Sequence, residues 1–363
     1  MKITFPHLGD AHILIRLLCK EMNVDCIVPP LNTLETLERG SRFSPEEICL
    51  PFKLMVGNIM AGIDNGADTV VMVSSNGPCR LGEYGELLKS VLDKNGYQAD
   101  WILLDTVRDI GIRELIRRAG FVWGGKKRSK LKLLKALKGI YKVVHSLEKM
   151  EKEIHIRCGY ETEKGKLKDM LYKCKRDICR CDTIKEAVKI IEQSSGKVKR
   201  IPIDRSRNPA KVMLTGEIFS LIDPFGNQYL EDKLMDMGVS FSKRITIGWW
   251  IDTTFVHSLK RAKMMKQSNG FLNYCIGGYA KDTVEEVIEA KKNHYDGVIQ
   301  LLPLGCMPEI VVKSIIPEMS DELDIKILTI VFDEMNGEAG YITRIEAFID
   351  MLQRRKQHVL YGY

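Results

Sequence analysis

Two cysteines occupy matching places in the sequence, each in a short turn after an apolar run. Cys306 follows residues 297–304 in GVIQLLPLGCMPEIV, and Cys79 follows the apolar run in ADTVVMVSSNGPCRLG. Glycine and proline in such turns let the backbone approach a bulky ligand, and free backbone amides can hydrogen-bond sulfur. The N-terminus of a following helix lowers the pKa of a thiol and favours the thiolate that a metal needs. Both cysteines are therefore candidate metal ligands.

Cys49 is a third candidate by the same argument. In PEEICLPFKLMVGN it lies just before Pro51 and another helical pattern. One such cysteine alone would more often be a small buried side chain. Three cysteines in matching contexts favour a shared metal site.

The remaining seven cysteines carry weaker signals. Cys19 and Cys26 lie in apolar stretches and are expected in the core. Four cysteines lie in a Lys- and Glu-rich segment: Cys158, Cys174, Cys179 and Cys181. The role of Cys275 is ambiguous. The spacing in CKRDICRC does not match the paired C-x-x-C of zinc or ferredoxin sites. Cys275 precedes Cys306 by 31 positions and Cys49 precedes Cys79 by 30, so Cys275 is an alternative fourth ligand.

Short apolar runs alternate with helical patterns along most of the chain. Helical patterns occupy residues 83–95, 282–294 and 307–319. The apolar runs predict strands at 2–5, 24–28, 69–74, 101–105, 211–216, 297–302 and 326–332. This alternation is typical of βαβ units and parallel sheets, so the predicted fold class is α/β.

The two α/β parts resemble each other as a diverged repeat. GADTVVMVSSNGPCRLG aligns with YDGVIQLLPLGCMPEIV: Cys79 lies 11 positions after Asp68, and Cys306 lies 10 after Asp296. The predicted domains are residues 1–125, a helical insert at 126–200, and residues 201–363. Ligands of open α/β sheets bind outside the carboxyl ends of the strands, so two facing sheets would bring both thiols to one cleft.

The composition is that of a soluble globular protein. The 363 residues are 45% apolar and 28% charged, enough for two domains. No apolar window reaches membrane-spanning length and the N-terminus lacks a signal-peptide pattern, so we expect a cytoplasmic protein without membrane partners. The net charge of +7 is concentrated at 124–144 and 173–180. These segments are either solvated helix faces or sites for nucleic acid, cofactor phosphates or an acidic partner.

Motifs for other chemistries are missing or incomplete. GYETEKGKL departs from the P-loop spacing, no G-x-G-x-x-G follows a strand, and there is no H-E-x-x-H or G-x-S-x-G. His7 and His12 flank the first predicted strand–helix turn, where they face the cleft or satisfy local hydrogen bonds. The acidic residues at strand ends, Glu217, Asp333 and Glu334, either transfer protons or cap helices.

Several of these segments together resemble a known family. ICLPFKLMVGN, NGPCRLGEYGE, LTGEIF, LPLGCMPEIV and FDEMNGEAGYITRIEAFIDML are similar to the CoA-enzyme activase-related proteins of the 2-hydroxyacyl-CoA dehydratase and double-cubane cluster superfamily. The resemblance covers about 1–125 and 201–355. It implies two Rossmann-like domains with an iron–sulfur cluster in the cleft between them.

Carried over to this sequence, the resemblance implies that Cys49, Cys79 and Cys306 ligate a 4Fe–4S cluster. One iron would then lack a protein thiolate and could take water, a substrate oxygen, or a sulfide bridging to a second cubane. A double cubane in one chain needs six cysteines, and here only three occupy family positions, so a bridged cluster would need other cysteines or a homodimer.

The resemblance also implies a partner, an ATP-hydrolysing 4Fe–4S activator protein that injects one low-potential electron. Fe–S potentials span roughly −700 to +450 mV, and a very negative couple needs an energy input. The leading hypothesis is an ATP-activator-dependent iron–sulfur reductase of a small substrate, or a dehydratase component that acts on a 2-hydroxyacyl-CoA thioester. The alternative is a non-catalytic electron-transfer or cluster-delivery subunit serving a separate dehydratase. A third hypothesis, a cluster-free thiol protein whose basic helices bind nucleic acid, ranks below both.

Overall fold

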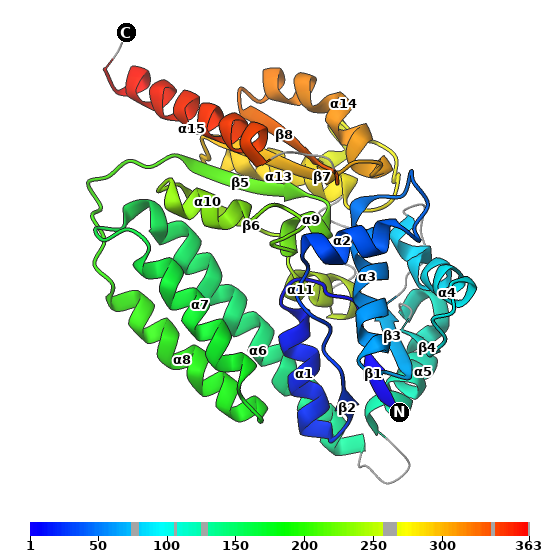
Figure 1. Ribbon diagram of the computed structural model, residues 1–363. Helices are drawn as coiled ribbons and strands as arrows, with labels where there is room; N and C mark the ends of the chain where they lie inside the picture. Colours follow the sequence, from blue (N-terminus) through cyan, green and yellow to red (C-terminus); the bar gives the residue numbers. More distant parts are fainter. Residues whose placement is uncertain (74–79, 105–106, 125–129, 257–266, 335–337, 362–363) are drawn as a thin grey trace.

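The computed structural model describes residues 1–73, 80–104, 107–124, 130–256, 267–334 and 338–361 (Figure 1). Within these residues the chain forms two α/β units, each built on a four-stranded, all-parallel sheet, and a group of three helices between them in sequence. The predicted α/β class with two Rossmann-like parallel-sheet domains is confirmed. No helix in the described part of the chain has the length and apolar character needed to cross a membrane.

The two sheets have the same topology. The N-terminal sheet has the order β2-β1-β3-β4 and the C-terminal sheet the order β6-β5-β7-β8. The N-terminal strands are β1 Lys2–Thr4, β2 Asp25–Cys26, β3 Thr69–Val73 and β4 Asp100–Leu104. The C-terminal strands are β5 Lys211–Gly216, β6 Ser240–Lys243, β7 Gly297–Pro303 and β8 Lys326–Phe332.

An equivalent hydrogen-bond pair marks the repeat at the residue level. The carboxylate of Asp68, just before β3, accepts a bond from the backbone N–H of Lys2 at the start of β1. The carboxylate of Asp296, before β7, accepts one from the N–H of Lys211 at the start of β5. Each aspartate thus holds the first residue of the central strand beside its own strand. The alignment of these two aspartates in the sequence therefore reflects a common local structure.

Helices connect the strands in the order expected for βαβ units. Those of the N-terminal unit are α1 Ala11–Met22, α2 Leu34–Ser41, α3 Leu50–Asp64, α4 Tyr84–Lys94 and α5 Val107–Ala119. Those of the C-terminal unit are α9 Ile218–Ile222, α10 Leu230–Asp236, α11 Ile247–Ile251, α13 Ala280–Lys292, α14 Met307–Glu322 and α15 Glu338–Tyr361. The predicted helical stretches match α4, α13 and α14 closely.

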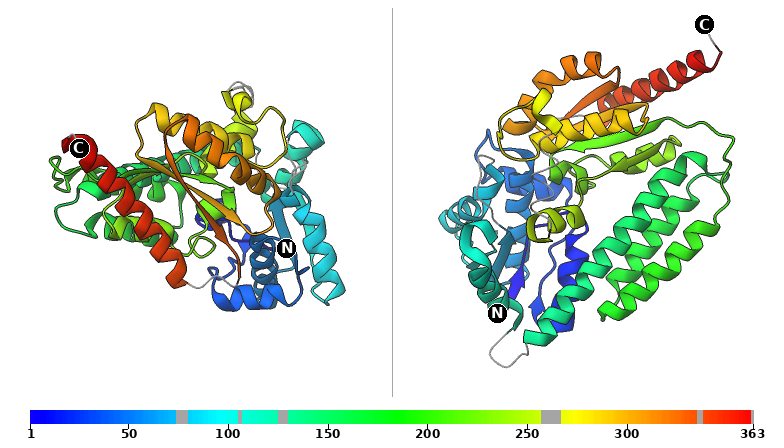
Figure 2. Two further views of the ribbon diagram at one scale, coloured as in Figure 1. Left: turned by 90° about the horizontal axis from the view of Figure 1, so that it is seen from above. Right: turned by 180° about the vertical axis from the view of Figure 1, so that it is seen from behind.

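The predicted insert contains three helices, α6 Lys130–Arg157, α7 Lys166–Cys179 and α8 Ile184–Arg200. A stripe of buried residues runs along α6 at intervals of three and four positions, through Val143, Leu147, Met150 and Ile154. This stripe packs α6 against α8 and also against α1 and β6. Figures 1 and 2 show the three helices side by side along one flank of both α/β units. The insert is therefore an integral layer that contacts both units.

Candidate functional site

Cys49 and Cys306 each stand at the N-terminus of a helix that follows a turn. Cys49 is the residue before α3 and Cys306 the residue before α14, and a proline lies in the first turn of both helices. Both have extended backbone angles, and neither side chain caps its helix. Each sulfur is thus attached at the positive end of a helix dipole, which stabilises a thiolate.

The turns that carry these two cysteines meet across the two α/β units. Gly305 has a left-handed φ of 81°, and a Cβ built on it would lie 3.4 Å from the carbonyl oxygen of Glu47 and 4.0 Å from the backbone nitrogen of Cys49. The left-handed backbone conformation favours glycine at this position, and a Cβ there would make ordinary van der Waals contacts with the Cys49 turn. Of the three cysteines predicted as ligands, Cys49 and Cys306 are therefore placed in turns that touch.

A tyrosine connects Cys49 to the helix that follows Cys79 in the chain. The Cys49 sulfur contacts the hydroxyl of Tyr84, the first residue of α4. Tyr84 is fully buried and its ring packs edge-on against Phe52 of α3, with 5.0 Å between the ring centroids. Cys79 itself lies outside the described residues. Its place in the chain, between β3 and the turn that begins at Arg80, corresponds to the place of Cys306 between β7 and α14.

No group of three His, Cys, Asp or Glu side chains suited to a metal is found in the part of the chain that the structure describes. Because that part excludes Cys79, the three-cysteine site stays a prediction. Cys275, the alternative fourth ligand, is exposed and lies five positions before α13, whereas Cys49 directly precedes α3. The equivalence of Cys275 and Cys49 in the repeat is therefore only approximate.

Two of the insert cysteines, Cys158 and Cys181, form hydrogen bonds to backbone carbonyl groups. The Cys158 thiol is buried and donates to the carbonyl oxygens of His155 and Val239, and the Cys181 thiol donates to that of Asp177. Burial raises the pKa of Cys174 and of Cys179, which favours the neutral thiol. Cys19 is buried as expected, while Cys26 is only half-buried.

The acidic residues at strand ends have partners of two kinds. The Glu217 carboxylate caps α9 by accepting bonds from the backbone N–H groups of Phe219 and Ser220. Glu334, after β8, accepts a bond of 2.9 Å from the ammonium of Lys53 in α3. The first is the capping role considered for these residues, and the second is an ion pair that joins the two α/β units.

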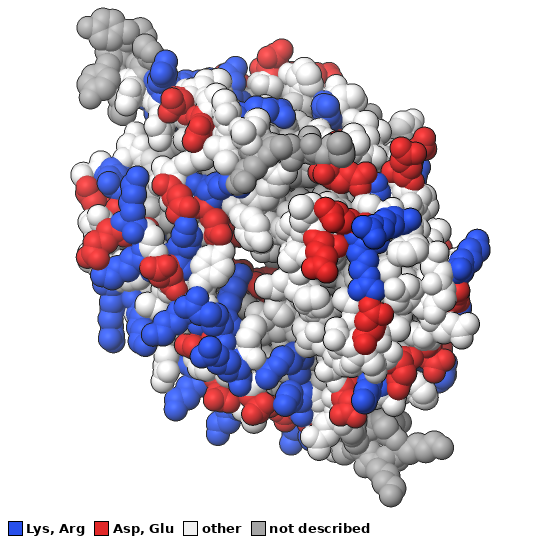
Figure 3. All heavy atoms as spheres, viewed as in Figure 1, with Lys and Arg blue, Asp and Glu red and all other residues white. Residues whose placement is uncertain are grey.

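A cavity of about 430 Å³ lies beside the loops that follow β1 and β5. Its walls come from the start of α1, from α6 and α7 of the insert, and from residues 221–243 of the C-terminal unit. Figure 3 shows the surface hollowed in this region, next to the Lys and Arg side chains gathered over α7 and α8. His7 and His12, the histidines at the first strand–helix turn, both line it.

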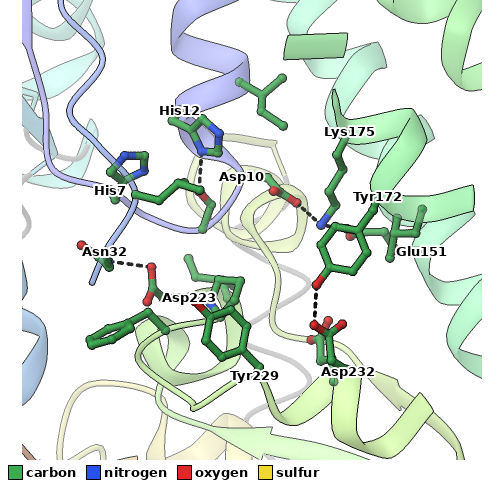
Figure 4. A pocket seen from close by; sticks show the side chains of 18 of the residues that line it. His7, Asp10, His12, Asn32, Glu151, Tyr172, Lys175, Asp223, Tyr229 and Asp232 are labelled. Atoms are coloured by element: carbon green, nitrogen blue, oxygen red, sulfur yellow. Dashed lines mark hydrogen bonds and ion pairs between the residues drawn. The ribbon is translucent and has the colours of Figure 1, made fainter. Parts of the chain in front are cut away.

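Half-buried ion pairs form one side of this cavity (Figure 4). The Lys175 ammonium lies 2.7 Å from an Asp10 carboxylate oxygen and 2.6 Å from one of Glu151. Burial acts to lower the pKa of Lys175, but the two carboxylates outweigh burial and raise it well above its usual range. Lys243 pairs with Glu231 in the same wall. Both ammonium groups are thus neutralised by the protein itself.

The two histidines are held in a defined arrangement. The Nε2 atom of His7 lies 2.6 Å from the carbonyl oxygen of Pro29, and the Nδ1 atom of His12 lies 2.9 Å from that of Gly9. Their rings are in edge contact, 4.9 Å between centroids. Burial and the neighbouring His12 lower the pKa of His7 to about 4, so His7 is neutral at physiological pH. The two histidines therefore line the cavity and also form local hydrogen bonds, the two roles considered for them.

A chain of side-chain amides connects the cavity to α3. The Asn58 amide of α3 donates to Asn32, and the Asn32 amide donates to an Asp223 carboxylate oxygen, each over 2.8 Å. The other Asp223 oxygen accepts a bond from the backbone N–H of Gly226. Burial and repulsion by Asp10 raise the pKa of Asp223 to about 6. Asp223 therefore combines a buried position with a carboxylate that still ionises near neutral pH.

The cavity residues Asp10, Asn32, Lys175 and Asp223 carried no motif in the sequence. Two of them had a weak signal there, and Asn32 and Asp223 had none. Asp10 lies between His7 and His12 at the first predicted strand–helix turn, and Lys175 lies in the basic stretch KCKRDICR.

Comparison with known proteins adds no assignment. A scan against models of protein families finds none that matches the chain, and no curated protein matches its sequence. The function must therefore be argued from the residues and their geometry.

Proposed function

We propose that this chain is an iron–sulfur redox protein in which Cys49, Cys79 and Cys306 hold a 4Fe–4S cluster between the two α/β units. The observation that carries the proposal is the contact between the turns of Cys49 and Cys306, made through Gly305. Two helices from different units thus present thiols at one junction. The topological repeat supplies the corresponding position for Cys79 after β3.

The donor set fits such a cluster. Iron–sulfur clusters are held by thiolates, and their potentials depend on hydrogen bonds to sulfur and on nearby charge. At this junction the two helix N-termini favour thiolates, and the Tyr84 hydroxyl contacts the Cys49 sulfur. When bound, the cluster would supply one-electron transfer. The role of this chain is then to hold the thiolates and to shield them by burial, since Cys306 is only 8% exposed.

The proposed electron donor is an ATP-hydrolysing 4Fe–4S activator protein. The chain has neither a P-loop nor a dinucleotide fingerprint of its own, which fits a separate ATPase. Basic side chains over α7 and α8 offer a surface for an acidic partner or for the phosphates of a CoA thioester (Figure 3). The proposed reaction is the low-potential reduction of a small substrate or the dehydration of a 2-hydroxyacyl-CoA.

Iron and acid-labile sulfide per chain, measured on protein purified without oxygen, test the cluster. We expect about four of each and the EPR signal of a reduced cubane after dithionite treatment; about eight irons would indicate a bridged double cluster. Cys49→Ala, Cys79→Ala and Cys306→Ala should each lose iron, while the matched control Cys275→Ala, at an exposed thiol, should retain it. Unchanged iron in the first three variants, or iron-free folded wild-type protein, would refute the proposal.

A second experiment separates an enzyme from an electron carrier. The loaded protein is mixed with an activator, ATP and a 2-hydroxyacyl-CoA, and both cluster reduction and product formation are followed. Turnover supports the catalytic role. Reduction of the cluster without CoA-ester binding or turnover would instead assign the chain to electron transfer for a separate dehydratase.

A further inference from the structure

The cavity beside α1, α7 and α10 has the properties of a ligand site. Its volume of about 430 Å³ falls within the range of small-molecule pockets. Three parts of the chain contribute to it, and it lies beside the loops after β1 and β5, at the carboxyl ends of the central strands. Open α/β sheets bind ligands in this place. The thiol junction uses the turns after β7 and before α3, and none of their residues lines the cavity, so the two are separate features.

The buried and half-buried side chains of the cavity carry more negative than positive charge. Two ammonium groups, those of Lys175 and Lys243, line it together with five carboxylates, those of Asp10, Glu151, Asp223, Glu231 and Asp232. Lys175 pairs with Asp10 and Glu151, and Lys243 pairs with Glu231. Arg176 and Arg180 also line the cavity but are exposed to water at its mouth.

Asp223 is a carboxylate of the cavity that pairs with neither Lys175 nor Lys243. It is 4% exposed, and its oxygens accept bonds from the Asn32 amide and the Gly226 N–H, which are neutral donors. Across the described residues no Lys, Arg or His forms an ion pair with it. A buried carboxylate costs free energy unless a cation accompanies it. Figure 4 shows the Asp223 carboxylate turned toward Asn32, below His7 and beside Tyr229, and it lines the cavity.

Tyr229 stands at the cavity in an unfavourable backbone conformation. Gln228 and Tyr229 are consecutive non-glycine residues with left-handed φ angles of 54° and 57°. Such angles disfavour side chains other than glycine, asparagine and aspartate, and strained residues cluster at ligand sites. The Tyr229 ring is nevertheless 48% exposed, so the strain is not compensated by burial in a core. An aromatic ring at the entrance of an acidic cavity is suited to contact with a cation.

We propose that this cavity binds a small metabolite with a protonated amine, whose ammonium group pairs with Asp223 and lies against Tyr229. An anion of similar size could reach the exposed Arg176 and Arg180, but beside Asp223 it would meet a carboxylate, and the ammonium groups of Lys175 and Lys243 are already paired. The site goes beyond the redox function proposed above and does not depend on it, because none of Cys49, Cys79 and Cys306 lines the cavity.

Three four-carbon probes that differ only in their end groups test the charge preference. They are 1,4-diaminobutane, 4-aminobutyrate and succinate, with binding measured by isothermal titration calorimetry and thermal shift on the full chain. We expect 1,4-diaminobutane to bind and succinate not to bind. Asp223→Asn should weaken diamine binding at least about tenfold, as expected for a lost hydrogen bond to a charged group. Asp169→Asn, the same charge change at an exposed position of α7, should leave it unchanged.

Two further results complete the test. Tyr229→Asn keeps a residue that tolerates the left-handed angle and removes the ring, so this variant should fold and bind the diamine several-fold more weakly. It serves as the decisive variant if Asp223→Asn does not fold. The proposal is overturned if succinate binds as tightly as the diamine, if none of the three probes binds the folded wild-type protein, or if both variants bind the diamine normally.

Discussion

Glu309→Gln is expected to stabilise the protein at alkaline pH and to leave its stability near pH 5 nearly unchanged. Glu309 lies in the first turn of α14 and is 1% exposed. The Thr283 hydroxyl and the Gln300 amide each donate to its carboxyl group over 2.9 Å. Among the described residues no cation forms an ion pair with it, and Glu217 and Glu286 add repulsion. Ionising this group inside the folded protein is therefore unfavourable.

The size of the effect follows from the pKa of Glu309 in the two states. Burial raises the pKa from 4.5 to about 8, and the hydrogen bonds from Gln300 and Thr283 oppose the rise only in part. A group whose pKa is raised by folding contributes stability that is complete below pH 4.5 and is lost as the pH rises through 8. At about 1.4 kcal/mol per pH unit, the loss between these limits is at most about 5 kcal/mol. Glutamine has no acidic proton to lose. Its single oxygen can accept the bond from the Gln300 amide while its NH2 group donates to the Thr283 hydroxyl, which can accept as well as donate.

Equilibrium unfolding in urea, followed by far-UV circular dichroism at pH 5, 7 and 9, measures this difference. The variant should gain several kcal/mol over the wild type between pH 5 and pH 9. Glu318→Gln, at an exposed position of the same helix, removes the same charge and should show no such gain. If the stability difference between Glu309→Gln and the wild type is the same at all three pH values, the raised pKa of Glu309 and the reasoning built on it are wrong.

Three more predictions follow from the same kind of argument. Gly305→Ala should destabilise the protein by roughly 1–2 kcal/mol, since its φ of 81° disfavours alanine, and should lower the iron content because relieving that angle shifts the turn that carries Cys306. Urea unfolding and iron analysis measure both effects, and normal values for both would contradict the role of this contact. Glu334→Gln leaves the buried Lys53 ammonium without its carboxylate and should lower the free energy of unfolding by about 1–2 kcal/mol at pH 7. Lys53→Gln is the companion variant. If neither variant is less stable than the wild type, the ion pair does not stabilise the fold. His7→Gln should make the free energy of unfolding less sensitive to acid. Because the folded-state pKa of His7 is about 4, the wild type should lose up to about 3 kcal/mol of unfolding free energy as the pH falls from 6.5 to 4. Urea unfolding over this pH range measures the loss, and an equally steep loss in the variant would contradict the prediction.

The strands and the repeat could be predicted from the sequence because they depend on local pattern. Buried parallel strands are continuous apolar runs, and all seven residues of β7 are indeed buried. The aligned Asp68 and Asp296 reflect equivalent hydrogen bonds to β1 and β5. The repeat and the rule that ligand loops lie at carboxyl strand ends predicted that Cys79 and Cys306 meet, and Cys79 lies outside the described residues. Cys49 was added because of its position before a helix, and it is the Cys49 turn that the structure places beside that of Cys306.

The cavity could not be predicted in this way because its residues depend on contacts between distant parts of the chain. Helical periodicity shows that Lys175 shares a face of α7 with other residues, but not which element packs on that face. KCKRDICR indicated a basic surface, whereas the Lys175 ammonium points inward to Asp10 and Glu151. Likewise, Asn58 interrupts the apolar pattern of α3 without revealing that its partner is Asn32.

Helix α3 connects the two proposed sites through rigid structure. Cys49 precedes its first residue, Lys53 near its N-terminus pairs with the C-terminal unit, and Asn58 near its middle begins the amide chain to Asp223. Asn58 is fully buried and also accepts a bond from the backbone N–H of His7. A shift of α3 that alters the thiol junction would therefore disturb hydrogen bonds at the cavity as well.

The equivalent helix of the second repeat has a different polar interior, and the contrast suggests how the two halves diverged. Helix α13 buries Asp282, Glu285 and Glu286, and Arg244 is the cation paired with the two glutamates. The two halves thus share strand order and the aspartates before β3 and β7, whereas the polar residues of α3 and α13 differ. Since α3 rather than α13 connects the thiol junction to the cavity, communication between the two sites is expected to run through the N-terminal unit.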